Sequence, residues 1–154
     1  MQKVTLLTVG SPRSSWIKDG IEEYICRLLG AFDFKILPVQ ASKSKDPNKQ
    51  FKEESQRLLS AIEKQEGDIW VLDESGKEFS SKEFADAISQ AGDIGIKITF
   101  VLGGAYGLSD EVRSRADHII ALSRMTFPHE LCQLIFLEQL YRVMQIQKGT
   151  GYHH

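Results

Sequence analysis

Short runs of apolar and β-branched residues alternate along this chain with longer segments that have the period of an amphipathic helix. Five such runs occupy residues 4–9, 34–39, 69–72, 98–102 and 118–122. The later runs are continuously apolar, which indicates strands buried on both faces of a sheet. Alternating strands and helices are typical of a parallel sheet that is covered by helices on both sides. The sequence therefore predicts an α/β fold, and we expect residues 1–154 to form a single domain.

Local signals mark two helix starts and one edge of the predicted sheet. Asp46 and Pro47 are suited to the cap and the first residue of a helix. Ser80 and Glu83 have the spacing of a capping box, in which each side chain binds the backbone amide of the other residue. Pro38 lacks an amide donor, so we expect the second strand to lie at an edge of the sheet.

The last predicted helix runs from about His129 to Gln147 and has more apolar residues than one buried face requires. A surface helix of a monomer needs a single apolar stripe. Here the apolar side chains cover more than one stripe: Leu131, Leu134, Ile135, Phe136, Leu137, Leu140, Tyr141, Val143, Met144 and Ile146. We therefore expect a homodimer that buries the second face. The alternative is a helix surrounded by the core of one chain.

Composition is that of an ordinary globular protein and argues against several functional classes. The 19 basic and 21 acidic residues give a net charge of −2, which argues against a surface coated by nucleic acid. No apolar run reaches the ~18 residues of a membrane span and no signal-peptide pattern opens the sequence, so we expect a cytoplasmic protein. Cys26 and Cys132 lack the neighbours of a zinc site, and we expect both to be buried and no metal to be bound.

A pair of glycines, Gly103 and Gly104, follows the fourth predicted strand. It has neither the G-x-G-x-x-G spacing of a dinucleotide-binding loop nor the Gly-Lys-Ser/Thr of a phosphate-binding loop. The carboxyl ends of neighbouring parallel strands converge on one crevice. Three such ends, at 72–76, at the glycine pair and at 122–127, would line it with backbone groups and apolar side chains. This crevice suits a mostly neutral ligand, such as an adenosine linked through sulfur to an amino acid, better than a triphosphate.

The three predicted strand ends belong to a set of motifs through which the sequence resembles a known family along its whole length. The family is that of the ribosomal large-subunit pseudouridine N3-methyltransferases, a compact branch of the SPOUT methyltransferases. The run from Met125 to His129, taken with the C-terminal pair, is the most specific part of the resemblance. The shared motifs are Val9-Gly10, Glu23-Tyr24, Leu72-Asp73-x-x-Gly76-Lys77, Gly103-Gly104-x-x-Gly107-Leu108, Ser123-Arg124-Met125-Thr126-Phe127-Pro128-His129, Glu138-Gln139-x-Tyr141-Arg142 and Tyr152-His153.

This resemblance implies a fold, a cofactor and a substrate. The fold would be a SPOUT domain with a trefoil knot near the C-terminus, although general rules of chain topology argue against knots. Members of the family bind S-adenosyl-L-methionine in the knot, act as homodimers and methylate N3 of a pseudouridine in 23S ribosomal RNA on the assembled ribosome. Carried over by motif, the cofactor contacts are Leu72, Gly103, Leu122, Ser123, Arg124, Met125, Thr126 and Phe127.

Methylation of N3 requires that an imide proton leave, so a general base near the reacting nitrogen would help. The titratable candidates are His129, Tyr152 and His153. Histidine is the better base near neutral pH, whereas a tyrosine of ordinary pKa would rather orient the base or stack. His129 could equally be a structural side chain at the start of its helix, and the tail residues owe their candidacy to the resemblance. Gly151 stands where many relatives have proline, which implies a more flexible tail.

Contacts to RNA would come from local basic residues, because phosphate contacts supply most of the non-specific affinity. Two alternatives to a ribosomal RNA methyltransferase stay open. One is a SPOUT methyltransferase that acts on tRNA, and the other is a ribosome-binding factor that has kept the fold and lost catalysis. The main candidates for RNA contact are Arg124 and Arg142, with peripheral contributions from Lys43, Lys45, Lys49 and Lys148.

Overall fold

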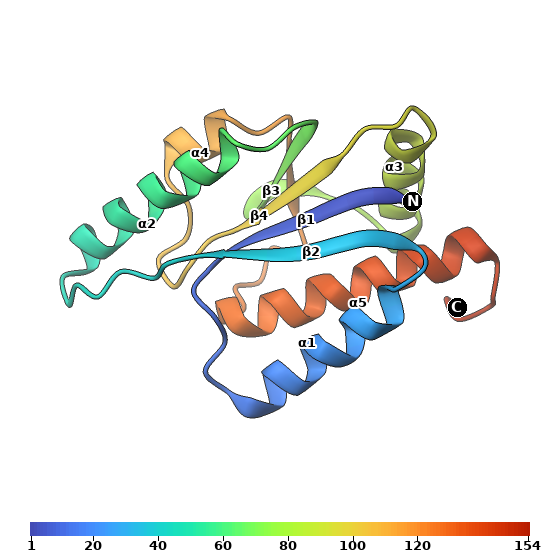
Figure 1. Ribbon diagram of the computed structural model, residues 1–154, viewed down its shortest axis with the longest axis horizontal. Helices are drawn as coiled ribbons and strands as arrows, with labels where there is room; N and C mark the ends of the chain where they lie inside the picture. The colour runs from blue at the N-terminus through green and yellow to red at the C-terminus, as the bar shows by residue number, and fades with distance from the viewer.

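A five-stranded sheet in the order β2-β1-β4-β3-β5 forms the centre of the molecule (Figure 1). The computed structural model describes residues 1–154. Every neighbouring pair of strands is parallel, which confirms the parallel α/β sheet that the sequence predicts. The strands are β1 (Gln2–Val9), β2 (Phe32–Val39), β3 (Asp68–Glu78), β4 (Ile98–Leu102) and β5 (His118–Ala121).

Helices cover both faces of this sheet. Helices α1, α3 and α5 pack together on one face, and α2 and α4 pack on the other (Figure 1). The longest helix, α5, lies between α1 and α3 and contacts both. The helices are α1 (Ser15–Leu28), α2 (Pro47–Ile62), α3 (Ser81–Asp93), α4 (Asp110–Ser114) and α5 (His129–Lys148).

The larger of the two hydrophobic clusters lies between the sheet and α5. Phe100 of β4 and Phe136 of α5 are fully buried, with ring centroids 4.7 Å apart, and Trp70 packs against Phe100 at 5.6 Å. Full burial of one such side chain stabilises the fold by about 1.5–3 kcal/mol. This packing fixes the start of α5 relative to the strand ends, where the candidate site lies.

The predicted helix starts and the sheet edge are confirmed. The Asp46 side chain accepts a hydrogen bond from the backbone amide of Asn48, and Pro47 is the first residue of α2. Both bonds of the capping box between Ser80 and Glu83 are present at the start of α3. Pro38 lies on β2, which is an edge strand of the sheet.

Strand β3 runs six residues beyond the end that the sequence predicts at Leu72. Its pairing with β5 is interrupted after Leu72 and resumes where Lys77 pairs with Ile120. Gly76 allows this close passage, because a Cβ atom there would lie 2.7 Å from the backbone nitrogen of Ile120. The partner strand, β5, is more than 40 residues away in the sequence, so no local sequence pattern predicts that β3 extends past Leu72.

The prediction that both cysteines are buried is wrong for Cys26. Its side chain is exposed, because the buried stripe of α1 passes through Ile17, Ile21 and Leu28 and leaves position 26 on another side of the helix. Cys132 is partly buried, as expected for a residue of α5. No group of His, Cys, Asp and Glu side chains is arranged to hold a metal ion.

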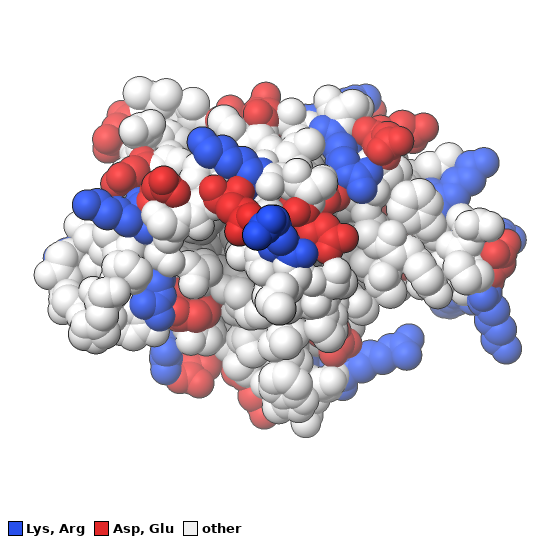
Figure 2. Space-filling view, turned by 180° about the vertical axis from the view of Figure 1, so that it is seen from behind, with Lys and Arg blue, Asp and Glu red and all other residues white.

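Charged side chains of both signs are interspersed on the face shown in Figure 2. This mixed surface agrees with the net charge of −2. None of the five helices combines the length and the apolar character that crossing a membrane would require.

Candidate functional site

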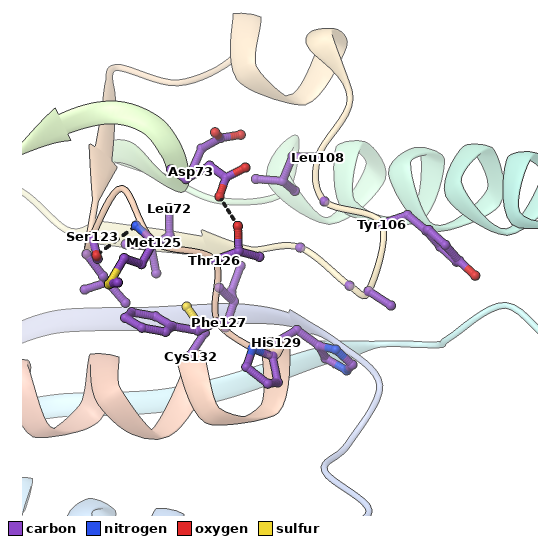
Figure 3. A pocket seen from close by; sticks show the side chains of 18 of the residues that line it. Leu72, Asp73, Tyr106, Leu108, Ser123, Met125, Thr126, Phe127, His129 and Cys132 are labelled. Atoms are coloured by element: carbon purple, nitrogen blue, oxygen red, sulfur yellow. Dashed lines mark hydrogen bonds between the residues drawn. The ribbon is translucent and has the colours of Figure 1, made fainter.

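The carboxyl ends of β4 and β5 meet the middle of β3, where its pairing with β5 is interrupted, in a pocket of about 750 Å³ (Figure 3). β4 and β5 contribute the segments that follow them, and β3 contributes Leu72, Asp73 and Glu74, at the carboxyl edge of the parallel sheet where the crevice is expected. The 19 lining residues are Leu72, Asp73 and Glu74; Leu102 to Leu108; Arg113; Leu122, Ser123 and Met125 to His129; and Cys132.

Two hydrogen bonds shape the segment that follows β5. The Ser123 hydroxyl accepts a bond of 2.9 Å from the backbone amide of Met125 and tightens the turn. The Thr126 hydroxyl donates a bond of 2.7 Å to the Glu74 carboxylate and ties the segment to β3 (Figure 3). Leu72, Thr126 and Phe127 all line the pocket, whereas Tyr106 lies at the rim with its ring directed outward (Figure 3).

An ion pair stands at the β3 side of the pocket. The Asp73 carboxylate accepts bonds from the Ser75 amide and hydroxyl at 2.9 and 2.8 Å, and from Arg113 Nε at 2.8 Å. Burial raises the pKa of Asp73, but the Ser75 and Arg113 bonds together outweigh burial and hold it below its usual range. Arg113 is the only lysine or arginine in the lining, and Asp73 already pairs with it.

The opposite wall is the start of α5, where His129 is the first helical residue. The next side chain, Glu130, accepts a bond of 2.6 Å from the backbone amide of Arg13, which ties the segment before α1 to α5. That bond lowers the pKa of Glu130. One turn further along, burial raises the pKa of the Cys132 thiol to about 11, so this pocket-lining sulfur stays protonated at neutral pH.

Most of the residues predicted to bind a cofactor line this one pocket. The exception is Arg124, whose side chain is 85 % exposed and whose Nε lies 3.0 Å from a Glu78 carboxylate oxygen. His129 also lines the pocket, as the prediction of a catalytic role requires. The predicted cofactor residues in the lining are Leu72, Gly103, Leu122, Ser123, Met125, Thr126 and Phe127.

The C-terminal tail does not reach the pocket of its own chain. Gly149 caps α5 in the left-handed conformation, and the chain then folds back along the helix (Figure 1). Tyr152 donates a bond of 3.2 Å to Glu138, and His153 Nδ1 lies 3.3 Å from Arg142. His129 and Arg142 are thirteen residues apart on α5, a separation of about 20 Å.

A cluster of aromatic and charged side chains holds the tail there. The Arg142 guanidinium stacks on the Tyr152 ring at 4.8 Å, and the Tyr141 ring packs edge-on against it at 5.1 Å. Arg142 also binds Glu138 through Nε and a terminal nitrogen, at 2.9 and 2.7 Å. Burial and the nearby Glu138 raise the pKa of Tyr152, so its phenol serves here as a hydrogen-bond donor.

Sequence reasoning placed the segment 72–76 at the crevice but gave no role to the Asp73 and Glu74 side chains, and it missed Arg113 altogether. Asp73 and Arg113 are 40 positions apart, and their pairing depends on how α4 is set against β3. A weak signal existed, because Asp73 belongs to a motif shared with the resembled family. Nothing in the sequence marks Arg113 as a pocket residue.

Comparisons with known proteins agree with this architecture. Residues 2–153 match the family model described as "Predicted SPOUT methyltransferase". The chain belongs to the SPOUT methyltransferase family. Curated relatives named "Ribosomal RNA large subunit methyltransferase H" include one from Christiangramia forsetii, 41% identical over 88% of this chain and 84% of that protein. Another, from Enterococcus faecalis, is 40% identical over 98% of this chain and 99% of that protein.

Solved structures of distant sequence share the fold of this SPOUT chain. A probable methylase family protein from Haemophilus influenzae superposes with a TM-score of 0.61 at 11% identity, over 98% of this chain and 70% of that one. A putative methylase family protein from Neisseria gonorrhoeae gives 0.58 at 13% identity, over 91% of this chain and 81% of that one. At such low identity these likenesses speak for the fold alone.

Proposed function

We propose that this chain is an S-adenosyl-L-methionine-dependent enzyme that methylates N3 of a pseudouridine in the large-subunit (23S) RNA of the assembled ribosome. The observation that carries the proposal is the single pocket into which three strand ends bring Leu72, Gly103 and most of the segment 122–127. The name of the relatives, which refers to large-subunit ribosomal RNA, supports the same substrate.

The chemistry of the pocket fits S-adenosyl-L-methionine. Leucine, methionine and phenylalanine side chains offer apolar walls for an adenine, and backbone groups of the strand ends offer polar contacts. Its charged side chains are two carboxylates, Asp73 and Glu74, and the single arginine that pairs with Asp73. This balance suits a ligand with a sulfonium and an ammonium group and disfavours a triphosphate.

When bound, the cofactor supplies a methyl group on a positively charged sulfur. The protein must then hold the target uracil in line with that methyl and accept the N3 proton. His129 lies in the pocket wall and is one candidate for the base. Tyr152, as a donor, is suited to orient the base, and His153 is a second candidate for the base.

A second copy of the chain would complete the site. Tyr152 binds Glu138 and His153 lies beside Arg142, at about 14 Å and 20 Å along α5 from His129 of their own chain, too far to act on the same bound substrate. We infer a homodimer in which the tail of one protomer serves the pocket of its partner. Support comes from Ile135 and Tyr141 of α5, which remain partly exposed, and from Trp16 of α1 and Leu29 at its end, which are 62% and 70% exposed.

RNA would approach over basic side chains around the two ends of α5. Arg124 is highly exposed beside the pocket, and Arg142 lies beside the tail. Each cation already has one acidic partner, so RNA phosphates would have to compete with Glu78 and Glu138. Lys43, Lys45, Lys49 and Lys148 are proposed as outer contacts.

The chain is further proposed to act as one domain and to contain a trefoil knot. The support for the knot is the family to which the chain belongs, through the resemblance described above. Because ribosomes are the proposed substrate, we also propose a cytoplasmic location.

Transfer of a labelled methyl group tests the substrate assignment. The protein and labelled S-adenosyl-L-methionine are incubated in three separate reactions. One contains intact ribosomes that lack the modification, one contains free 23S RNA, and one contains bulk tRNA. We expect label in the large-subunit RNA of intact ribosomes. Label in tRNA would instead support a tRNA methyltransferase, and calorimetry that detects no cofactor binding would support a non-catalytic factor.

A further inference from the structure

A buried carboxylate lies behind the glycine pair of the pocket. Glu54 of α2 is 6% exposed, and its neighbour Glu53 carries an ion pair with Arg57. Its Oε2 accepts a bond of 3.0 Å from the backbone amide of Ser42, while Oε1 makes no hydrogen bond or ion pair with the protein and keeps some contact with solvent. Glutamate side chains are rarely this deeply buried, because desolvation of the charge is costly. The burial of Glu54 therefore calls for a reason.

Oε1 of Glu54 occupies the space beside Gly104. A Cβ atom at Gly104 would lie 2.7 Å from this oxygen, a distance that real Cβ atoms do not adopt. The next nearest atoms belong to Val9, at 3.4 and 3.5 Å, which is ordinary van der Waals contact. Gly104 does not have a positive φ, so its backbone conformation is open to alanine. An alanine methyl at this position would therefore have to displace the Glu54 carboxylate and nothing else.

Gly104 in turn shapes the pocket. Its carbonyl accepts a bond of 3.1 Å from the Gly107 amide, which closes the loop after β4, and both glycines line the cavity. Glu54 itself is absent from the lining. Its influence on a ligand would therefore act through the loop.

We propose that Glu54 is a positioning residue of the cofactor site. Its carboxylate is held on one side by the Ser42 amide and bears on Gly104 on the other, so that α2 sets where the loop 103–107 stands. This inference rests on the proposed function, because it concerns the pocket assigned to S-adenosyl-L-methionine.

Glu53 provides a matched control on the same helix. Its Oε2 accepts a bond of 2.6 Å from the Ser42 hydroxyl, so it contacts the same segment as Glu54. Its side chain is 32% exposed and none of its contacts is with the glycine loop. Glu53→Ala removes an equal charge from the neighbouring position and spares the proposed contact.

A double-mutant cycle tests the contact. The dissociation constant for S-adenosyl-L-methionine is measured by calorimetry for the full chain and for Glu54→Ala, Gly104→Ala, the double variant, Glu54→Gln and Glu53→Ala. Melting temperatures are recorded alongside. We expect each of the first two single changes to weaken binding about tenfold or more, equivalent to about 1.4 kcal/mol. Glu54→Gln, which keeps the shape and an acceptor for Ser42, and Glu53→Ala stay within about threefold of the unmodified chain.

The decisive result is the double variant. With the carboxylate removed, the alanine methyl at 104 takes its place, so the double variant binds the cofactor more tightly than Gly104→Ala alone. Additive losses, or unchanged affinity in folded Glu54→Ala, would overturn the proposal. If Glu54→Ala does not fold, Glu54→Asp replaces it in the cycle, because the shorter side chain also clears the space beside Gly104. Absence of binding by the unmodified chain would instead overturn the proposed function, and this inference with it.

Discussion

Tyr152 and His153 are the residues on which the proposed chemistry depends most. In one chain they bind Glu138 and Arg142, away from the pocket. In the proposed dimer they serve the partner's pocket. We expect replacement of both by alanine to lower kcat by about 10²-fold or more, the range for loss of a general base, while cofactor affinity stays unchanged. His154→Ala, at the adjacent position, serves as the control, and methyl transfer to ribosomes is the measurement.

Contradiction would come from a double variant that methylates ribosomes as fast as the unmodified chain. The tail would then have no catalytic part, and His129 would be the remaining candidate for the base.

Asp73 links the pocket to stability and to pH. Its pKa is lower in the folded chain than its ordinary value of 3.8, so its ionised form stabilises the fold above that pH, and the stabilisation is lost as pH falls through the lower, folded value. In Asp73→Asn the side chain faces Arg113 either with its amide nitrogen, which is a donor, or with its amide oxygen, which is a weaker acceptor than a carboxylate. We expect a loss of about 1–2 kcal/mol in the free energy of unfolding at pH 7.

Denaturant titrations of the unmodified chain and of Asp73→Asn, from pH 7 to pH 2.5, measure this effect. The difference in their free energies of unfolding should be constant well above pH 3.8 and shrink as the pH falls below it. A difference that persists undiminished at the lowest pH would show that the ionised carboxylate is not its source.

Single residues show where sequence reasoning succeeds. Leu72, Gly103 and the segment 122–127 could be assigned to one site because parallel strands must end at one edge of the sheet. The direction of the Arg124 side chain could not be predicted, since it depends on Glu78, which a strand extension brings within 3.0 Å.

Helix α5 carries the proposed dimer interface. Phe136, Leu137 and Leu140 are fully buried within the chain, whereas Ile135 is partly exposed and is not packed against the larger core cluster. Ile135→Arg should therefore leave the fold intact and convert the dimer to monomers, because a charge would be placed in an apolar interface. The rate of methyl transfer should fall as well, because the tail of a monomer could no longer reach the pocket of a second protomer.

Sedimentation at micromolar concentration measures the change. Ile94→Arg is the control, because Ile94 is 73% exposed and follows α3. An unmodified chain that sediments as a monomer would rule out the shared site.

At the scale of elements, periodicity and caps predicted the starts of α2 and α3 and the edge position of β2. They could not predict that β3 continues past Leu72, because its partner β5 is distant in sequence. Nor could they predict the path of the tail, which depends on positive φ angles at Gly149 and Gly151. A proline at position 151 could not adopt the φ of 75° seen at Gly151, so this path of the tail is open to glycine and closed to proline.

The proposed knot would be a property of the whole chain. Stretching the protein from its two ends unfolds the domain, and a knotted chain then stays shorter than the contour of 154 extended residues, because the tightened knot retains part of the chain. We expect this shortfall in single-molecule force measurements. Full extension would contradict the knot and leave the parallel sheet unaffected.

Mass spectrometry of the RNA product tests the central claim most directly. Intact ribosomes that contain the unmethylated pseudouridine are incubated with the protein and S-adenosyl-L-methionine, and the large-subunit RNA is digested and sequenced by mass. The account predicts one added methyl group at N3 of a single pseudouridine, and none when the Tyr152 and His153 double variant replaces the protein. A methyl group on tRNA or on another base, or no methyl group despite cofactor binding, would contradict it.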